Sequence, residues 1–222
     1  MKRAPLWLFD LDNTLHDAAY ALFPAIDNNM TEFIARVLAA ESGDVSTANA
    51  IRIKYWQCYG ATLLGMIKHH AVRAEDFLRD AHTFDDMTSM IRVERGLRSL
   101  FHRLPGKKIL LTNAPKHYAL TVVRHMGLHR HFKKHIAIES MRVHGQWRPK
   151  PSKSLLRSIL AREKKRARDC IVVEDTRAVL KSAKAVGMRT MWVTGYHPYV
   201  SGCPHYVDVK LKSVRQLHKR IF

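Results

Sequence analysis

The chain has 222 residues, of which 46% are hydrophobic and 26% charged, a composition typical of a globular protein with one core domain, with or without a smaller insertion. No stretch approaches the roughly 20 uninterrupted apolar residues of a membrane span, and the first residues lead directly into an apolar run without room for a cleavable signal. We therefore expect a cytoplasmic protein without a membrane partner.

The formal net charge is +19, from 38 Lys and Arg against 19 Asp and Glu. One interpretation is nucleic-acid binding, in which a basic surface releases counterions from phosphates. The other is steering of a small anionic substrate. The densest basic run, residues 164–168, lies between a predicted helix and a predicted strand, where a solvated helix end is the simpler interpretation. The three cysteines are widely spaced and form no C-x-x-C pair, which argues against a zinc or redox centre.

A short buried strand is predicted at Leu6–Phe9, followed directly by Asp10 and Asp12. In an extended strand, side chains i and i+2 project to the same face, so the two carboxylates point the same way. Two adjacent acids repel each other unless a cation lies between them, and Mg²⁺, which works with phosphate substrates, is the expected ion. The alternative is that residues 12–13 form a turn and that Asp10 is a solvated strand end.

Residues 18 to about 102 are predicted to be almost entirely helical, because apolar residues recur there at spacings of three and four. The first helix should start near Pro24 and stop near Ser42 and Gly43. Further amphipathic helices are predicted at 46–58, 61–71, 74–80 and 88–102.

From Pro105 onward, strands and helices alternate, which is typical of βαβ units. Strands are predicted at 108–112, 136–138, 170–173 and 189–193, with a weak last strand near 206–207. Helices are predicted at 115–126, 152–162, 176–186 and 213–220. The fold class is therefore α/β: a doubly wound parallel sheet with a helical insertion after its first strand. In such sheets, ligands bind at the carboxyl ends of the strands.

Polar side chains follow several of these predicted strands. Besides the two aspartates there are Thr112 and Asn113, Lys150 before a helix, and Glu174 and Asp175. Each has a structural alternative: a helix cap for the Thr-Asn pair and for the acidic pair, and a surface lysine. Together they form one ordered set of acids, hydroxyl, lysine and acids that is difficult to obtain by accident.

These residues resemble the haloacid dehalogenase (HAD) superfamily of phosphohydrolases over almost the whole chain. Its D-x-D-x-T motif is met by residues 10–14, its strand-end Thr or Ser by Thr112, its Lys by Lys150 and its acidic pair by Glu174 and Asp175. The resemblance implies a Rossmann-like core of residues 1–17 and 103–222, and a helical cap domain of residues 18–102.

The resemblance also implies roles. Asp10 would be the nucleophile that forms an aspartyl-phosphate, and Asp12 would protonate the leaving oxygen and then deprotonate water. Thr112 and Lys150, assisted by Asn113, would hold the phosphoryl oxygens. Mg²⁺ would be held by Asp10, the Asp12 carbonyl, Glu174 and Asp175.

A finer resemblance, to pyrimidine 5′-nucleotidases that hydrolyse UMP or CMP, depends on local strings at residues 9–16, 59–65, 112–115 and 173–176. His16 and Tyr59 are then candidate substrate contacts, with a turn histidine and a core tyrosine as the alternatives, whereas Trp56 is predicted to be core. Two other functions remain: a phosphatase or phosphomutase for a sugar phosphate or similar metabolite, and a basic nucleic-acid-binding protein. The oligomeric state is not predicted.

Overall fold

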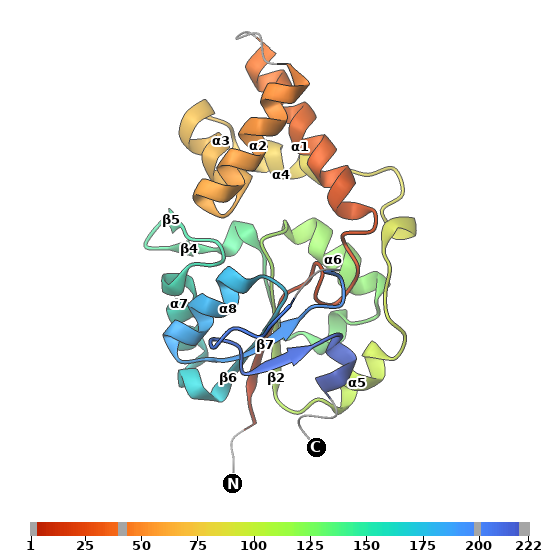
Figure 1. The fold of residues 1–222 in the computed structure, drawn as a ribbon, viewed down its shortest axis with the longest axis vertical. Helices are drawn as coiled ribbons and strands as arrows, with labels where there is room; N and C mark the ends of the chain where they lie inside the picture. The colour runs from red at the N-terminus through yellow and green to blue at the C-terminus, as the bar shows by residue number, and fades with distance from the viewer. Residues whose placement is uncertain (1–3, 40–43, 198–200, 218–222) are drawn as a thin grey trace. The chain divides into compact units, whose positions relative to one another are not determined.

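The computed structural model describes residues 4–39, 44–197 and 201–217. It divides into two compact units, one of residues 20–90 and one of residues 1–19 and 91–222, and each is described by itself. The second unit is built on a six-stranded sheet with the strand order β3-β2-β1-β6-β7-β8, in which every neighbouring pair is parallel (Figure 1). The predicted doubly wound α/β fold is confirmed. Its strands are β1 (Leu6–Phe9), β2 (Lys107–Leu111), β3 (Lys134–Ile136), β6 (Cys170–Glu174), β7 (Arg189–Val193) and β8 (Val209–Leu211).

Helices cover both faces of the sheet, with α7 (Lys153–Glu163) and α8 (Arg177–Val186) on one side and α5 (Leu97–Arg103) and α6 (Lys116–His125) on the other (Figure 1). Successive side chains of β1 point to opposite faces of the sheet, so this one strand packs against the helices on both sides. Leu6 and Leu8 pack in a cluster with residues of α7 and α8. Trp7 and Phe9 face the other way, and the Phe9 ring lies 4.9 Å from that of Phe101 in α5. All four β1 side chains are fully buried, which is why the strand is apolar throughout.

The helical unit consists of α1 (Leu22–Leu38), α2 (Val45–Tyr59), α3 (Thr62–His70) and α4 (Ala74–Ala81). The predicted end of the first helix near Ser42 and Gly43 lies outside the described residues. Gly65 in α3 lies against the ring of Tyr55, so close that a Cβ atom there would come within 2.1 Å of that ring. Trp56, predicted to be core, is instead 60% exposed. The buried residues of α2, Ala48 and Tyr55, are seven apart and share a face, and Trp56 is turned about 100° from it.

The predicted helix at 88–102 is wrong over its first half. Only a 3₁₀ turn, η2 (Thr88–Met90), and then α5 are helical. Between them Gly96 has a φ of +90°, which stops helical propagation, and the Arg92 carbonyl accepts a hydrogen bond from the Asp17 amide at 3.0 Å. Because Phe101 packs on Phe9, α5 belongs to the unit that contains the sheet.

Smaller differences concern the later strands. The third predicted strand is shifted to β3, and the last strand is β8 rather than residues 206–207. The final helix is described only as a 3₁₀ turn, η6 (Val214–Leu217), and residues 218–222 lie outside the described residues. A hairpin of β4 (Arg142–Val143) and β5 (Gln146–Trp147) was not predicted. Its turn residues His144 and Gly145 both have positive φ, as a type I′ hairpin turn requires.

One ion-pair group joins α7 to the sheet. The Glu163 carboxylate, whose side chain is only 6% exposed, accepts hydrogen bonds from Lys107 of β2 at 2.5 Å and Lys134 of β3 at 2.6 Å. Burial acts to raise the pKa of Glu163, but the two ammonium groups outweigh it and hold this pKa below the ordinary value of 4.5.

We expect Glu163→Gln to reduce the free energy of unfolding by about 1 kcal/mol at pH 7, because two charge-assisted bonds weaken. The depressed pKa means that this stabilisation is present above the ordinary Glu pKa and is lost as the pH falls through the lower native value. Urea unfolding between pH 7 and pH 3 should therefore show the two curves converging at acid pH. The exposed Glu32→Gln is the control, and a difference that persists unchanged at pH 3 would contradict the assignment.

Candidate active site

Asp10 lies immediately beyond β1 at the centre of the sheet. Its amide donates to the Val173 carbonyl of β6 at 3.0 Å, so its backbone is held by the parallel ladder, and its side chain is buried. The chain then turns sharply at Asn13, which has a φ of +54°. This turn brings the Thr14 hydroxyl back to donate to Asp10 Oδ2 at 3.3 Å. Asp10 is thus held in place by one hydrogen bond to its backbone and one to its carboxylate.

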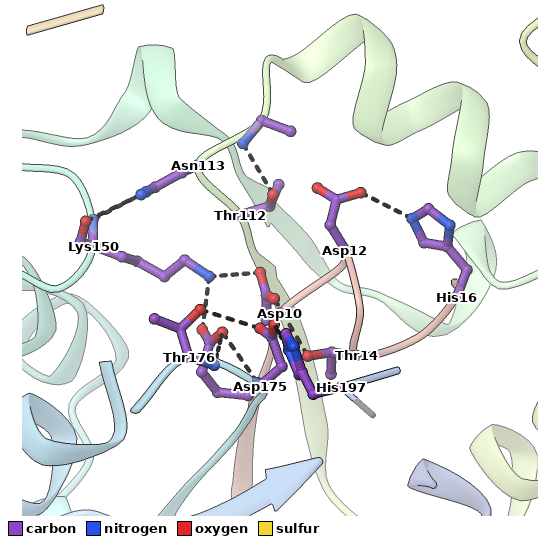
Figure 2. A network of polar contacts seen from close by, with 12 residues as sticks. Asp10, Asp12, Thr14, His16, Thr112, Asn113, Lys150, Asp175, Thr176 and His197 are labelled. Carbon is purple, nitrogen blue, oxygen red and sulfur yellow. Dashed lines mark hydrogen bonds and ion pairs between the residues drawn. The ribbon is translucent and has the colours of Figure 1, made fainter. Parts of the chain in front are cut away.

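Lys150 supplies a buried positive charge beside Asp10. Its Nζ donates to Asp10 Oδ1 at 2.5 Å (Figure 2). The same Nζ donates to Glu174 Oε2 at 2.7 Å. Lys150 lies on no strand, and the Asn113 amide positions it through two backbone hydrogen bonds. Asn113 Oδ1 accepts from the Lys150 amide, and Asn113 Nδ2 donates to the Lys150 carbonyl, both at 3.0 Å.

Burial controls the electrostatics of this group. It raises the pKa of Asp10 to about 7, with a further increase from Glu174 that Lys150 partly offsets. Burial likewise raises the pKa of Glu174 to about 7, opposed by Lys150 and assisted by Asp175. Burial alone would lower the pKa of Lys150, but the Asp10 and Glu174 carboxylates outweigh it and raise that pKa. The lysine is therefore held charged between two acids that need a cation.

Asp10, Glu174 and Asp175 form a three-carboxylate group that could hold a metal ion, since one ligand oxygen from each lies within 4.8 Å of the others. An all-oxygen, anionic donor set suits a hard divalent cation such as Mg²⁺. Asp175 is held in place through its backbone and its side chain. Its carbonyl accepts from Trp192 Nε1 at 2.8 Å, and its Oδ2 contacts His197 Nε2 at 2.7 Å (Figure 2). This bond to Asp175 raises the pKa of His197 against the effect of burial.

The Asp12 carboxylate has different partners. Its Oδ1 accepts hydrogen bonds from the Tyr118 hydroxyl at 2.7 Å and from His16 Nε2 at 2.9 Å. Tyr118 belongs to α6 and is fully buried, and burial raises its pKa, so the hydroxyl stays protonated and donates. His16, a candidate substrate contact from the sequence, is also fully buried. The structure therefore places its ring against Asp12 and not on an exposed surface.

The remaining predicted phosphate ligands lie at the end of β2. Thr112 is buried, its amide donates to the Ile136 carbonyl, and its Oγ1 accepts from the Ala114 amide at 3.0 Å. The side-chain amide of Asn113 forms both of its hydrogen bonds described above with the Lys150 backbone. The structure therefore shows Asn113 in contact with the lysine segment.

Tyr59 lies in the helical unit at the end of α2. Its ring is half-buried, its hydroxyl contacts His69 Nε2 at 2.7 Å, and the Lys68 ammonium lies 5.2 Å from the ring centre. The ring is thus in a mixed aromatic and cationic environment.

Two polar residues of the site were missed from the sequence, Tyr118 and His197. Tyr118 lies in the first turn of α6 and fits the apolar spacing of that helix, so the sequence pattern indicates a core residue. Its distance of 106 residues from Asp12 leaves no local signal. His197 follows β7 by four residues, and position near a strand end was the one available indication.

Among the described residues, none of the helices combines the length and the apolar character that crossing a membrane requires.

Several solved structures are similar to this chain. A HAD phosphatase from Thermococcus onnurineus is 15% identical, with 98% of this chain and 97% of that chain covered and a TM-score of 0.66. A 2-haloacid dehalogenase from Pseudomonas syringae pv. Tomato is 20% identical, with 98% and 97% covered and a TM-score of 0.59. A HAD-hydrolase from Bacillus subtilis bound to magnesium is 15% identical, with 99% of each chain covered and a TM-score of 0.59.

At these identities the likeness to solved structures concerns the fold. The family is shown by a match of residues 6–187 to the model of the haloacid dehalogenase-like hydrolases. That span runs from β1 to the end of α8 and contains Asp10, Asp12, Thr112, Lys150 and the acidic pair. The chain belongs to the haloacid dehalogenase-like hydrolase family.

Proposed function

We propose that the protein is a Mg²⁺-dependent phosphate monoester hydrolase in which Asp10 is the nucleophile. The observation that carries this proposal is that two aspartates only two residues apart have different hydrogen-bond partners. Asp10 lies among Lys150, Glu174 and Asp175, whereas the Asp12 carboxylate is held by Tyr118 and His16. One acid thus lies beside a lysine and two further carboxylates, and the other is bonded to a tyrosine and a histidine.

The reaction follows in two balanced steps. An Asp10 oxygen attacks phosphorus, the bond from phosphorus to the ester oxygen breaks, and that oxygen keeps the electron pair while it takes a proton from Asp12. Asp12, now a carboxylate, then removes a proton from water as the water oxygen attacks phosphorus. The bond between Asp10 and phosphorus breaks, which returns the electron pair to Asp10 and leaves the proton on Asp12.

Lys150 and Thr112 are proposed to bind the phosphoryl oxygens. The buried ammonium would lower the repulsion between the Asp10 carboxylate and an anionic phosphate. The three-carboxylate group, with the Asp12 carbonyl as a further ligand, would hold Mg²⁺, which when bound supplies additional positive charge to the phosphoryl group. Asn113 would contribute by positioning the lysine, since both ends of its amide contact the Lys150 backbone.

One structural neighbour is a 2-haloacid dehalogenase, so displacement of halide is a second candidate reaction. A halide leaves without a proton, so its departure does not require a general acid such as Asp12. It also has no dianionic substrate for a lysine and a metal ion to neutralise. The arrangement around Asp10 therefore favours phosphoryl transfer.

The proposed substrate is a pyrimidine nucleoside monophosphate such as UMP or CMP. This part rests on the local sequence strings at residues 9–16, 59–65, 112–115 and 173–176, with a sugar phosphate or similar metabolite as the alternative. The cap domain expected at residues 18–102 is proposed here for residues 20–90, because the segment from residue 91 onward belongs to the unit that contains the sheet. Tyr59 is the proposed contact for the base. Its half-buried ring is suitable for stacking.

We expect Mg²⁺ to raise the melting temperature of the protein, because an ion that binds only the folded state stabilises it. At a hundred times the dissociation constant the gain is about 2.7 kcal/mol, with each kcal/mol equivalent to about 2 to 4 °C for a chain of this size. Asp175→Asn should abolish most of this shift in a thermal denaturation titration. Asp169→Asn, at an acid outside the group, should retain it. Equal shifts in both variants would exclude the three-carboxylate group as the metal site.

Asp10→Asn should lower phosphate monoester turnover by at least about 10⁴-fold, since the amide is a poor nucleophile. The measurement is phosphate release in the presence of Mg²⁺ from UMP, CMP and several sugar phosphates and, as a separate dehalogenase test, chloride release from chloroacetate. A clear preference for UMP and CMP supports the proposed substrate. Turnover retained by Asp10→Asn rules out Asp10 as the nucleophile, and halide release without phosphate release rules out the phosphatase. Asp169→Asn again serves as the matched control.

A further inference from the structure

Asp12 Oδ1 receives two hydrogen bonds from residues that lie in different parts of the chain. The Tyr118 hydroxyl approaches from α6 at 2.7 Å, and His16 Nε2 approaches from the segment after β1 at 2.9 Å. The Asp12–His16 contact is strengthened by a backbone bridge between the same two residues. An ionised Asp12 can only accept hydrogen bonds, so we assign the proton of the His16 ring to Nε2. A carboxyl oxygen has two lone pairs in its plane, and the Tyr118 hydroxyl and His16 Nε2 occupy those of Oδ1.

The His16 ring is fully buried, and Figure 2 shows it turned toward Asp12. Within the part of the chain that the structure describes, its other ring nitrogen, Nδ1, is buried without a hydrogen-bond partner. A buried polar atom without a partner carries a free-energy cost, so a purely structural histidine at this position would be a poor choice. The interaction that offsets this cost is the hydrogen bond between Nε2 and the carboxyl group of Asp12.

We propose that Tyr118 and His16 are positioning residues that fix the orientation of the Asp12 carboxyl group. Oδ1 accepts their two hydrogen bonds, and Oδ2 carries the proton that is exchanged with substrate and water. This inference deepens the proposed phosphatase function and rests on it.

The physical reason is geometric. The carboxyl group of an aspartate rotates readily about its terminal torsion, which is broad and two-fold, so an unrestrained acid would point its proton in several directions. Two donors to one oxygen stop this rotation, and with both lone pairs of Oδ1 engaged the acid proton must be on Oδ2. A general acid that is misplaced by about an ångström loses much of its effect on rate.

The consequence depends on the leaving group. An alkyl phosphate needs a proton on the departing oxygen, whereas p-nitrophenolate departs readily as an anion. We expect Tyr118→Phe to lower kcat/KM for an alkyl phosphate by about 10- to 100-fold, part of the total effect of a general acid. For p-nitrophenyl phosphate the loss should be within about threefold. Because kcat/KM reports the steps up to ester cleavage, the later attack of water does not obscure this comparison.

The experiment measures kcat/KM with Mg²⁺ for p-nitrophenyl phosphate, phenyl phosphate and an alkyl phosphate that the unmodified protein accepts. Tyr196→Phe is the matched control, because it also removes a tyrosine hydroxyl that donates to a carboxylate, that of Glu94 at 3.2 Å. It should leave the dependence on leaving group unchanged. His16→Gln keeps a side-chain donor and should retain more alkyl phosphate activity than His16→Leu, which gives a second test if Tyr118→Phe fails to fold.

The outcomes separate this inference from the proposed function. An equal loss for all three esters in Tyr118→Phe, or equal activities of His16→Gln and His16→Leu, overturns the positioning role and leaves the phosphatase intact. If the unmodified protein hydrolyses neither these aryl esters nor UMP, CMP or any sugar phosphate, the proposed function fails and this inference fails with it. A loss that grows as the leaving group becomes poorer, with Tyr196→Phe unaffected, supports it.

Discussion

The buried ion pairs of Lys150 are the interaction on which the rest of the site depends. Two carboxylates, Asp10 and Glu174, are fully enclosed at the carboxyl edge of the sheet, and neither could stay ionised there without a cation. Removal of one partner from such a buried group typically costs about 3 to 5 kcal/mol, because it leaves charge uncompensated. The ammonium thus has a structural task and the proposed catalytic one at the same position.

The fold was largely predictable because its core strands are buried on both faces. A strand with that burial has to be a short apolar run, and β1, β2, β6 and β7 all show one. Polar residues directly after such runs marked the sheet edge, which is why Asp10, Thr112 and the acidic pair could be selected. The incorrect secondary-structure predictions lie where the spacing of apolar residues carries little information. Around residue 96 a glycine with positive φ interrupts an otherwise helical pattern, and a two-residue strand such as β4 has too few positions to show alternation.

The parts of the site that could not be predicted are contacts between distant segments. Sequence spacing shows that Asp10 and Asp12 are near each other, but the turn at Asn13 and the approach of α6 decide that their carboxyl groups have different partners. His16 illustrates the same limit. A polar residue beside a catalytic motif suggests a ligand contact, and only its complete burial against Asp12 reveals that its partner belongs to the protein. The environment of each acid is therefore a tertiary property.

The two bonds between Asn113 and the backbone of Lys150 have a consequence for how the chain can vary. They imitate one rung of a β-ladder with a side chain in place of a strand, and they fix the lysine segment to the end of β2. On its other side that segment is closed by Ser152, whose hydroxyl caps α7 by accepting from the Leu155 amide. Neither of these contacts involves a residue of the β4–β5 hairpin that precedes the lysine. We therefore expect that hairpin to tolerate insertions and deletions while the lysine stays beside the nucleophile.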